Sequence, residues 1–386
     1  MNTVTWHFCI YSFPGFVFLI HSPAYFFVQK APQNSPFYLF CPSVELSHPV
    51  PYTEKKEENA MATLSYKENM LCVLHHKEPE YIPLNDDFNN GFSSVVMETG
   101  RDRTKPSQDW FGQYWTFEPT IGGFNPTPGV HLVTDITCWR DQMKFPDLDA
   151  IDWKAAAKKD TAHWDRENKL CRITMGYGLW ERMFSVMEFQ DALVSLLEEP
   201  EACFDFFSAV ADYKIEVFKR IIQYYKPDQI VFHDDYGNTK AMFMSPDTWR
   251  ELIKPNLQRV IDFVTGEGVF YEHHCCGNFA PIVEEIADMG ASSFNTCHVS
   301  MHPAELKKKI GYKMAFMGGF DNQFIDAITT TEEQTRKHAR DVIDAMAPGG
   351  SWCPRFVNSV PEKRAYVNDE IINYGGHHYY TCPRPA

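Results

Sequence analysis

Short apolar segments alternate with helical segments along most of this chain, and that alternation limits its fold more than any other feature. Segments such as "CRITMGYG" from Cys171, "DQIVFHDDYG" and "VFYEHHCCGN" have the length and residue types of buried strands. Longer stretches with helical periodicity separate them. Such alternation predicts a parallel sheet, because parallel strands need a crossover connection, usually a helix.

The helical stretches carry the expected start and stop residues. Residues 189–225 predict two helices with a break near Pro200, since proline ends or restarts a helix. Residues 245–266 predict one helix, with Ser245 as N-cap, Pro246 in the first turn and Gly266 near the end.

The motifs and the polar strand ends favour one α/β fold over another. No G-x-G-x-x-G fingerprint opens a helix, and no G-x-x-x-x-G-K-[ST] phosphate loop occurs. Polar residues instead gather at the predicted strand ends, as in "HDDYG", "HHCCGN", "MGGFDN" and "SWCPRF". We therefore predict a (β/α)8 TIM barrel, whose chemistry sits at the C-terminal ends of the strands, and not a doubly wound sheet.

The first sixty residues differ from the rest. Residues 1–29 contain no Asp, Glu, Lys or Arg, so they lack the positive start of a secretory signal. Pro14 and Pro23 interrupt any apolar stretch long enough to span a membrane. Helical periodicity begins only after Met61. We interpret 1–60 as a disordered leader or an over-extended start, with a membrane anchor as the alternative, and 61–386 as one barrel domain.

Charge and cysteine content exclude some classes of function. The net charge of −15 argues against a nucleic-acid partner, which needs clustered Lys and Arg. The 11 cysteines are odd in number and irregular in spacing. In a chain of this length they indicate free thiols or metal ligands in a reducing compartment, and hence a cytoplasmic protein without a membrane partner.

The segment "EHHCCGN" suggests a metal site. His274 and Cys276 have one residue between them, so on a strand their side chains point the same way. Cys353 follows at another predicted strand exit. One His and two Cys suit Zn²⁺, and three protein ligands leave an open fourth position, as in catalytic zinc sites. Buried free cysteines are also common.

Register is ambiguous at this point, because His273 and Cys275 have the same spacing and face the opposite side. Gly277, which frees the backbone to turn after Cys276, favours the pair His274 and Cys276.

Acidic residues near the strand ends are candidates for catalysis. Asp234 and Asp235 follow a predicted strand, so we expect one of them to accept a substrate proton or to orient a zinc ligand. The alternative is that they cap a helix or form a loop turn. Glu181 is a candidate fourth, displaceable zinc ligand, or else a salt-bridge partner. The residues predicted to contact substrate are Tyr236, Gly319 and Asp321.

Five segments of the sequence resemble a known family. "GYGLWERMFSVMEFQDALVSLLEEPE", "HDDYGNTKAMFMSP", "MSPDTWRELIKPNLQRVIDFVTGEG", "EHHCCGNFAPIVEEIADMGASSFN" and "MAFMGGFDNQ" are similar to the uroporphyrinogen decarboxylase superfamily. The resemblance covers nearly all of 61–386 and implies a (β/α)8 barrel, in agreement with the strand–helix alternation.

The resemblance implies one of two chemistries. Decarboxylases of this superfamily use no metal and hold substrate acetates with arginines from an N-terminal segment, whereas residues 75–92 here contain no arginine. A polycarboxylate without cationic partners binds poorly. The other branch comprises cobamide-dependent methyltransferases with zinc on an H-x-C pair plus a distant Cys, which His274, Cys276 and Cys353 match.

The resemblance therefore favours a zinc-dependent methyltransferase that moves a methyl group between a corrinoid and a thiol or methoxylated small molecule. The chain has no D-x-H-x-x-G corrinoid motif, so the corrinoid would come on a separate protein or as free cobalamin. A porphyrin-type decarboxylase and a non-catalytic corrinoid- or metal-binding accessory protein are the alternatives. The methyl donor, the acceptor and the oligomeric state, a homodimer included, stay open.

Overall fold

The computed structural model describes residues 12–13, 16–20, 26–29, 64–84, 89–90, 101–119, 123–356 and 360–380. They fall into two units, Met1–Lys56 and Glu57–Ala386. The first unit contains a small antiparallel sheet of β1 (Ser12–Phe13), β2 (Phe16–Ile20) and β3 (Phe26–Gln29). The predicted boundary at residue 61 lies outside the described residues and stays a prediction.

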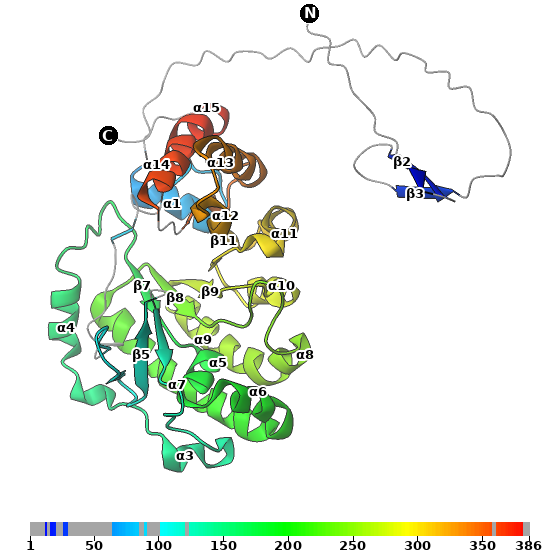
Figure 1. Ribbon diagram of the computed structural model, residues 1–386. Coiled ribbons are helices and arrows are strands. Elements are labelled where there is room, and N and C mark those ends of the chain that lie inside the picture. Colours follow the sequence, from blue (N-terminus) through cyan, green and yellow to red (C-terminus); the bar gives the residue numbers. More distant parts are fainter. Residues whose placement is uncertain are drawn as a thin grey trace, which may run out of the picture. The chain divides into compact units, whose positions relative to one another are not determined.

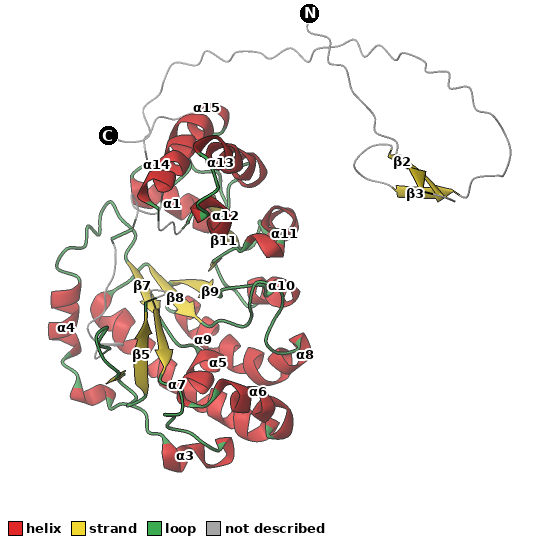
Figure 2. Cartoon of the chain, viewed as in Figure 1, coloured by secondary structure: helices red, strands yellow, loops and turns green. Residues whose placement is uncertain are grey.

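The second unit is built on a parallel sheet, as the alternating pattern predicted (Figure 2). Its described strands follow one another in chain order, β12-β11-β10-β9-β8-β7, and every neighbouring pair is parallel. The strands are β7 (Arg172–Met175), β8 (Gln229–His233), β9 (Phe270–His274), β10 (Ser293–Asn295), β11 (Ala315–Met317) and β12 (Trp352–Cys353).

Helices connect consecutive strands, and Figure 1 shows β7, β8 and β9 side by side with helices next to them. The α-helices are α1 (Tyr66–Leu74), α3 (Trp139–Gln142), α4 (Trp153–Asp160), α5 (Leu179–Val186), α6 (Phe189–Glu198), α7 (Pro200–Tyr225), α8 (Pro246–Thr248), α9 (Lys254–Gly266), α10 (Ala280–Asp288), α11 (Pro303–Ile310), α12 (Asn322–Asp326), α13 (Glu332–Met346), α14 (Pro361–Asp369) and α15 (Gly376–His378).

The chain before β7 contacts both outer strands of this sheet. Asn89 forms a parallel bridge with Leu170, next to β7, while the Cys353 thiol of β12 lies 3.8 Å from the carbonyl oxygen of Pro83. This arrangement agrees with the predicted (β/α)8 barrel. An antiparallel sheet that the sequence did not predict, β4 (Ser107–Gln108), β5 (Tyr114–Glu118) and β6 (Gly123–Pro126), is added before β7.

Local sequence explains where several helices begin and end. The predicted break at Pro200 is confirmed, since α6 ends at Glu198 and α7 has the proline in its first turn. Ser245 caps α8 by accepting a hydrogen bond from Thr248 N at 3.0 Å. The single helix predicted for 245–266 is instead divided by a π-helical segment, 249–253, just before Pro255. Proline has no N–H for the carbonyl one turn earlier, which accounts for the irregular turn.

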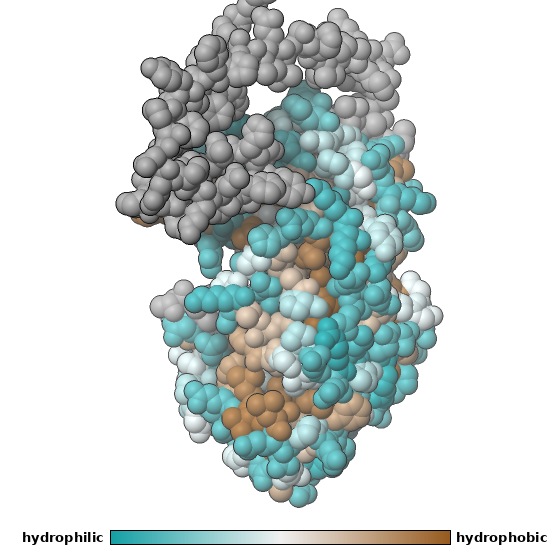
Figure 3. Space-filling view, turned by 90° about the vertical axis from the view of Figure 1, so that its right-hand side faces the viewer, coloured by the Kyte–Doolittle hydropathy of each residue, from teal (hydrophilic) through white to brown (hydrophobic). Residues whose placement is uncertain are grey.

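Large apolar side chains fill the space between the sheet and its helices. Trp180, Phe218, Phe232 and Trp249 are all 0% exposed. Full burial of a side chain of this kind contributes about 1.5–3 kcal/mol. Hydrophilic residues cover most of the face in Figure 3, with an apolar area in its lower part. None of the described helices is both long and apolar enough to cross a membrane.

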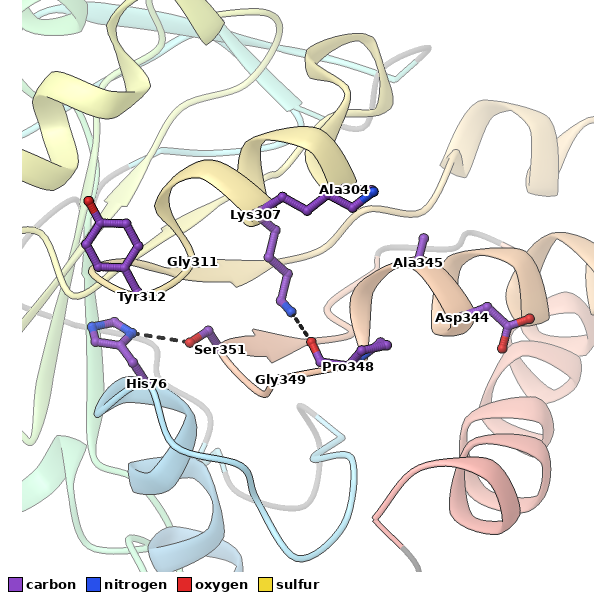
Figure 4. A pocket seen from close by; sticks show the side chains of 11 residues that line it. His76, Ala304, Lys307, Gly311, Tyr312, Asp344, Ala345, Pro348, Gly349 and Ser351 are labelled. Atoms are coloured by element: carbon purple, nitrogen blue, oxygen red, sulfur yellow. Dashed lines mark hydrogen bonds between the residues drawn. The ribbon is translucent and has the colours of Figure 1, made fainter. Parts of the chain in front are cut away.

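A cavity of about 460 Å³ marks the amino-terminal end of the strands (Figure 4). It is lined by residues that precede β11 and β12, among them Tyr312 and Ser351. Lys307 reaches across it and donates a hydrogen bond to the Pro348 carbonyl at 2.6 Å, and His76 lies 3.4 Å from the Ser351 hydroxyl. The side chains described next lie at the opposite, carboxyl end of the strands.

Candidate metal centre

Two neighbouring strands bring four metal-binding side chains together. His233 ends β8 and His274 ends β9, and these two residues are directly paired in the sheet. Their rings stack with centroids 3.9 Å apart. Asp235 and Cys276 lie two residues beyond the ends of these strands. One donor atom from each of the four residues lies within 4.8 Å of all the others.

Backbone contact between the two loops keeps these side chains close. Asn278 N donates to the Asn238 carbonyl at 2.7 Å, and Cys276 N donates to Asp235 Oδ1 at 2.5 Å. Gly277 has φ +78°, and a Cβ there would lie 2.6 Å from the carbonyl oxygens of Gly237 and Asn238. Such a contact is shorter than real Cβ atoms show, so the approach requires glycine, as the sequence indicated.

His274 presents one ring nitrogen to the group. Its Nε2 lies 3.4 Å from Cys276 Sγ and 3.9 Å from Asp235 Oδ1, while its Nδ1 lies 2.5 Å from Asn295 Oδ1. Burial, together with nearby His233 and Arg355, holds the pKa of His274 well below its usual value. The imidazole is therefore neutral at pH 7, which is the form that binds a metal.

His233 is held from behind by Glu181 of α5. Its Nδ1 lies 2.6 Å from Glu181 Oε2, and the glutamate side chain is only 6% exposed. Burial raises the pKa of Glu181 to about 7, against the opposing effect of His233. Burial alone would lower the pKa of His233, but Glu181 outweighs it and raises that pKa to about 9. Without a metal, Glu181 thus favours the protonated form of His233, which would have to release a proton to bind a metal ion, and Glu181 is not one of the four clustered donors.

Asp234 performs the structural role that the sequence left open. Its carboxylate accepts hydrogen bonds of 2.8–3.2 Å from the backbone N–H groups of Leu179, Trp180 and Glu181. These three residues are the first of α5. A Cβ on Gly178 would lie 2.5 Å from the Asp234 side chain. Asp234 is 0% exposed, and burial raises its pKa to about 6, with these hydrogen bonds opposing. It caps the start of α5, which is the structural alternative stated for this residue, and its role in proton transfer stays a prediction.

The opposite face of the same strand is enclosed. His273 stacks on Tyr236 with centroids 5.5 Å apart, and both are 0% exposed. The Tyr236 hydroxyl donates to Asp234 at 3.0 Å, and Tyr236 N donates to Cys275 Sγ at 3.2 Å. Burial lowers the pKa of His273 to about 3. Tyr236, predicted to contact substrate, is therefore a core residue. The preferred register, with His274 and Cys276 toward the site, agrees with this geometry.

Cys353 is not among the four clustered donors. It lies in β12, is 0% exposed, and packs in an apolar cluster with Met70, Leu170 and Met317. His233 takes part in its place. The sequence carried a signal for this histidine that was not used, because "HDD" at the end of β8 has the same one-residue spacing as "HCC" at the end of β9.

Two further predicted substrate residues, Asp321 and Gly319, have contacts with α12 and α13. Asp321 caps α12 by accepting a hydrogen bond from Phe324 N at 3.0 Å. A Cβ on Gly319 would contact Val342 and Met346 of α13 at 3.8 Å. The backbone of this loop approaches another segment closely at Gly318, where a Cβ would lie 2.8 Å from the Thr296 carbonyl oxygen.

Comparisons with known proteins agree with this fold. Residues 173–353 match the family model for uroporphyrinogen decarboxylase (URO-D). A solved structure described as a methyltransferase from Methanosarcina mazei superposes with a TM-score of 0.56 at 14% identity, covering 80% of this chain and 98% of that one. No curated protein matched the sequence.

The strand–helix units that hold the donor group therefore match the family model for uroporphyrinogen decarboxylase, in agreement with the resemblance of the sequence motifs. The superposition shows that this chain shares the α/β fold of that structure.

Proposed function

We propose that this enzyme is a zinc-dependent methyltransferase that moves a methyl group between a corrinoid and a thiol or methoxylated small molecule. The observation that carries the proposal is the group of four donors within 4.8 Å of one another. Two imidazoles, a carboxylate and a thiol fit Zn²⁺, which takes nitrogen, sulfur and oxygen ligands in tetrahedral sites. His233 and Asp235 join the predicted pair His274 and Cys276, and Cys353 is outside the proposed set.

The roles of this chain's own residues follow from their contacts. Bound zinc would lower the pKa of a thiol substrate or polarise a methoxy oxygen, and the substrate would either displace one of the four donors or add as a fifth ligand. Glu181 holds Nδ1 of His233 and so fixes the orientation of that ring. The Cys276 N–H orients the carboxylate of Asp235. The side chains of His233, Asp235 and His274 are 27%, 23% and 13% exposed, so a small molecule can reach the group from solvent.

The remaining expectations belong to the proposal as well. The corrinoid would come on a separate protein or as free cobalamin, and the enzyme would be cytoplasmic. The superposed structure from Methanosarcina mazei is described as a methyltransferase, which supports a proposal of methyl transfer, and it is 14% identical to this chain. A metal-free decarboxylase is disfavoured because the four donors lie together at the end of the strands where barrel chemistry occurs.

Metal analysis and a corrinoid assay test the proposal together. We expect the purified full-length protein to hold about one zinc per chain, removable by a chelator. We expect it to change the absorbance of methylcobalamin in the presence of a thiol, or of reduced cobalamin with a methoxylated compound. Cys276→Ser should lose both properties, whereas His273→Gln, changed on the enclosed face, should retain both if it folds.

Two other results would identify the alternatives. A protein that binds no zinc yet decarboxylates a porphyrinogen would be a decarboxylase. A protein that binds zinc but leaves methylcobalamin unchanged with every thiol and methoxylated compound tested would be an accessory protein. Either result would overturn the proposed reaction.

A further inference from the structure

A buried carboxylate connects the interior of the sheet to the donor group. Glu272 of β9 is 0% exposed, and its carboxylate contacts Arg172 of β7 at 2.6 Å and Arg355, after β12, at 3.3 Å. The Ser293 hydroxyl and the Gln229 amide also donate to it, at 2.9 and 3.3 Å. A buried charge is tolerated only when it is paired and hydrogen-bonded, and these contacts meet that requirement. The position of Glu272 is therefore set from several strands at once.

Glu272 fixes the orientation of Asn295. The Nδ2 amide group of Asn295 donates to Glu272 Oε1, and Asn295 is 1% exposed. If the amide were flipped, its oxygen would face the carboxylate, so that two acceptors would meet without a proton between them. The carboxylate thus leaves Asn295 Oδ1 as the atom that faces His274, at 2.5 Å from Nδ1.

The amide oxygen in turn decides which nitrogen of His274 carries the proton. Oδ1 only accepts hydrogen bonds, so Nδ1 of His274 must be the donor. In a neutral imidazole the other nitrogen, Nε2, then has a free lone pair. Nε2 is the atom that lies 3.4 Å from Cys276 Sγ and 3.9 Å from Asp235.

From this chain of contacts we infer that Asn295 is a positioning residue, oriented by Glu272, that holds His274 in the Nδ1–H tautomer and so prepares its Nε2 to bind the metal. The tautomer is a property of this network with or without metal. The consequence for metal affinity rests on the proposed function. Partners behind a metal-bound histidine typically contribute roughly 10- to 100-fold to metal affinity.

Nitrogen-15 NMR of histidine-labelled, metal-free full-length protein tests the tautomer directly. His274→Gln identifies the signals of His274. We expect wild-type His274 to carry its proton on Nδ1 at pH 7, and the Asn295→Leu variant to show a mixture of tautomers. Finding the proton on Nε2 in the wild-type protein would overturn the inference, even if the variant failed to fold.

Zinc titration tests the consequence, with another buried asparagine as the control. Asn295→Leu should weaken zinc binding roughly 10- to 100-fold. Asn69 of α1 is also fully buried, with hydrogen bonds to Glu80 and Tyr81, and Asn69→Leu should leave zinc affinity unchanged. Equal zinc affinity in Asn295→Leu and wild type would contradict the positioning role.

The two proposals fail in different ways. A wild-type protein that bound no zinc but kept the Nδ1–H tautomer would overturn the metal-dependent function and still support the role of Asn295. A protein that bound zinc with His274 in the opposite tautomer would support the function and overturn the role of Asn295.

Discussion

The two faces of one short segment, His273–Cys276, have the same residue types and different environments. His273 and Cys275 are enclosed by Tyr236 and the helix layer, and each is 0% exposed. His274 and Cys276 instead meet donor atoms supplied by β8. A His-x-Cys pair is thus a candidate metal site only on the face where a neighbouring strand offers further ligands. Residue type is shared by both faces, and the neighbours make the difference.

The comparison is tested most strongly by removing one thiol at a time. Cys276→Ser should lower zinc affinity by at least about 100-fold, because it removes a ligand outright. Cys275→Ser should bind zinc like the wild type. Isothermal titration calorimetry on both variants decides the matter, and equal losses in the two would mean that the faces are not functionally distinct.

A second test addresses the backbone that positions the active face. Gly277→Ala adds a Cβ where the carbonyl oxygens of Gly237 and Asn238 leave no room, so we expect a loss of about 3 kcal/mol in unfolding free energy. Gly268 has a similar φ of +76° with nothing within 4 Å, so Gly268→Ala should lose only about 1 kcal/mol. Urea denaturation measures both, and similar losses would show that crowding at Gly277 is unimportant.

A third test concerns Asp234, whose carboxylate caps α5. Asp234→Ala should cost about 2 kcal/mol of stability, because three backbone N–H groups lose their buried acceptor. Asp135, an exposed cap that accepts from Thr137 N, provides the control, and Asp135→Ala should cost less than about 1 kcal/mol. An Asp234→Ala protein with unchanged thermal stability and no activity would instead indicate direct participation in catalysis.

On the enclosed face, we expect a substitution to change the stability of the protein and not its zinc affinity. Cys275→Ser replaces a fully buried thiol with a smaller, more polar hydroxyl and should lower the unfolding free energy by about 1 kcal/mol, measured by thermal or urea unfolding. A variant as stable as wild type would mean that this face tolerates polar groups and is less tightly packed than its burial indicates.

The smallest effect is expected at Cys353. Because it lies outside the donor group, Cys353→Ser should keep zinc affinity within about twofold of wild type. Loss of zinc from this variant would favour the predicted three-ligand set of His274, Cys276 and Cys353 over the proposed set that includes His233 and Asp235.

The sequence predicted helix boundaries correctly where they depend on hydrogen bonds between residues close together in the chain. The break at Pro200 follows from the missing N–H of proline. The cap at Ser245 follows from a serine hydroxyl that accepts a hydrogen bond from an N–H group in the first turn of the helix. The π-helical segment before Pro255 and the small antiparallel sheet were not predicted. The π-helical segment follows from the local effect of Pro255 inside the predicted helix, whereas the antiparallel sheet depends on how its segments pair, which periodicity does not report.

The sequence by itself determined the strand–helix alternation, the parallel sheet and the His274–Cys276 pair, because each depends on residues close together in the chain. Only the tertiary structure decided the rest of the donor group. Pairing of β8 with β9 placed His233 and Asp235 beside that pair, and Cys353 outside the group. Distances between side chains on different strands depend on sheet register and on which side chains share a face, and a linear spacing does not contain either quantity.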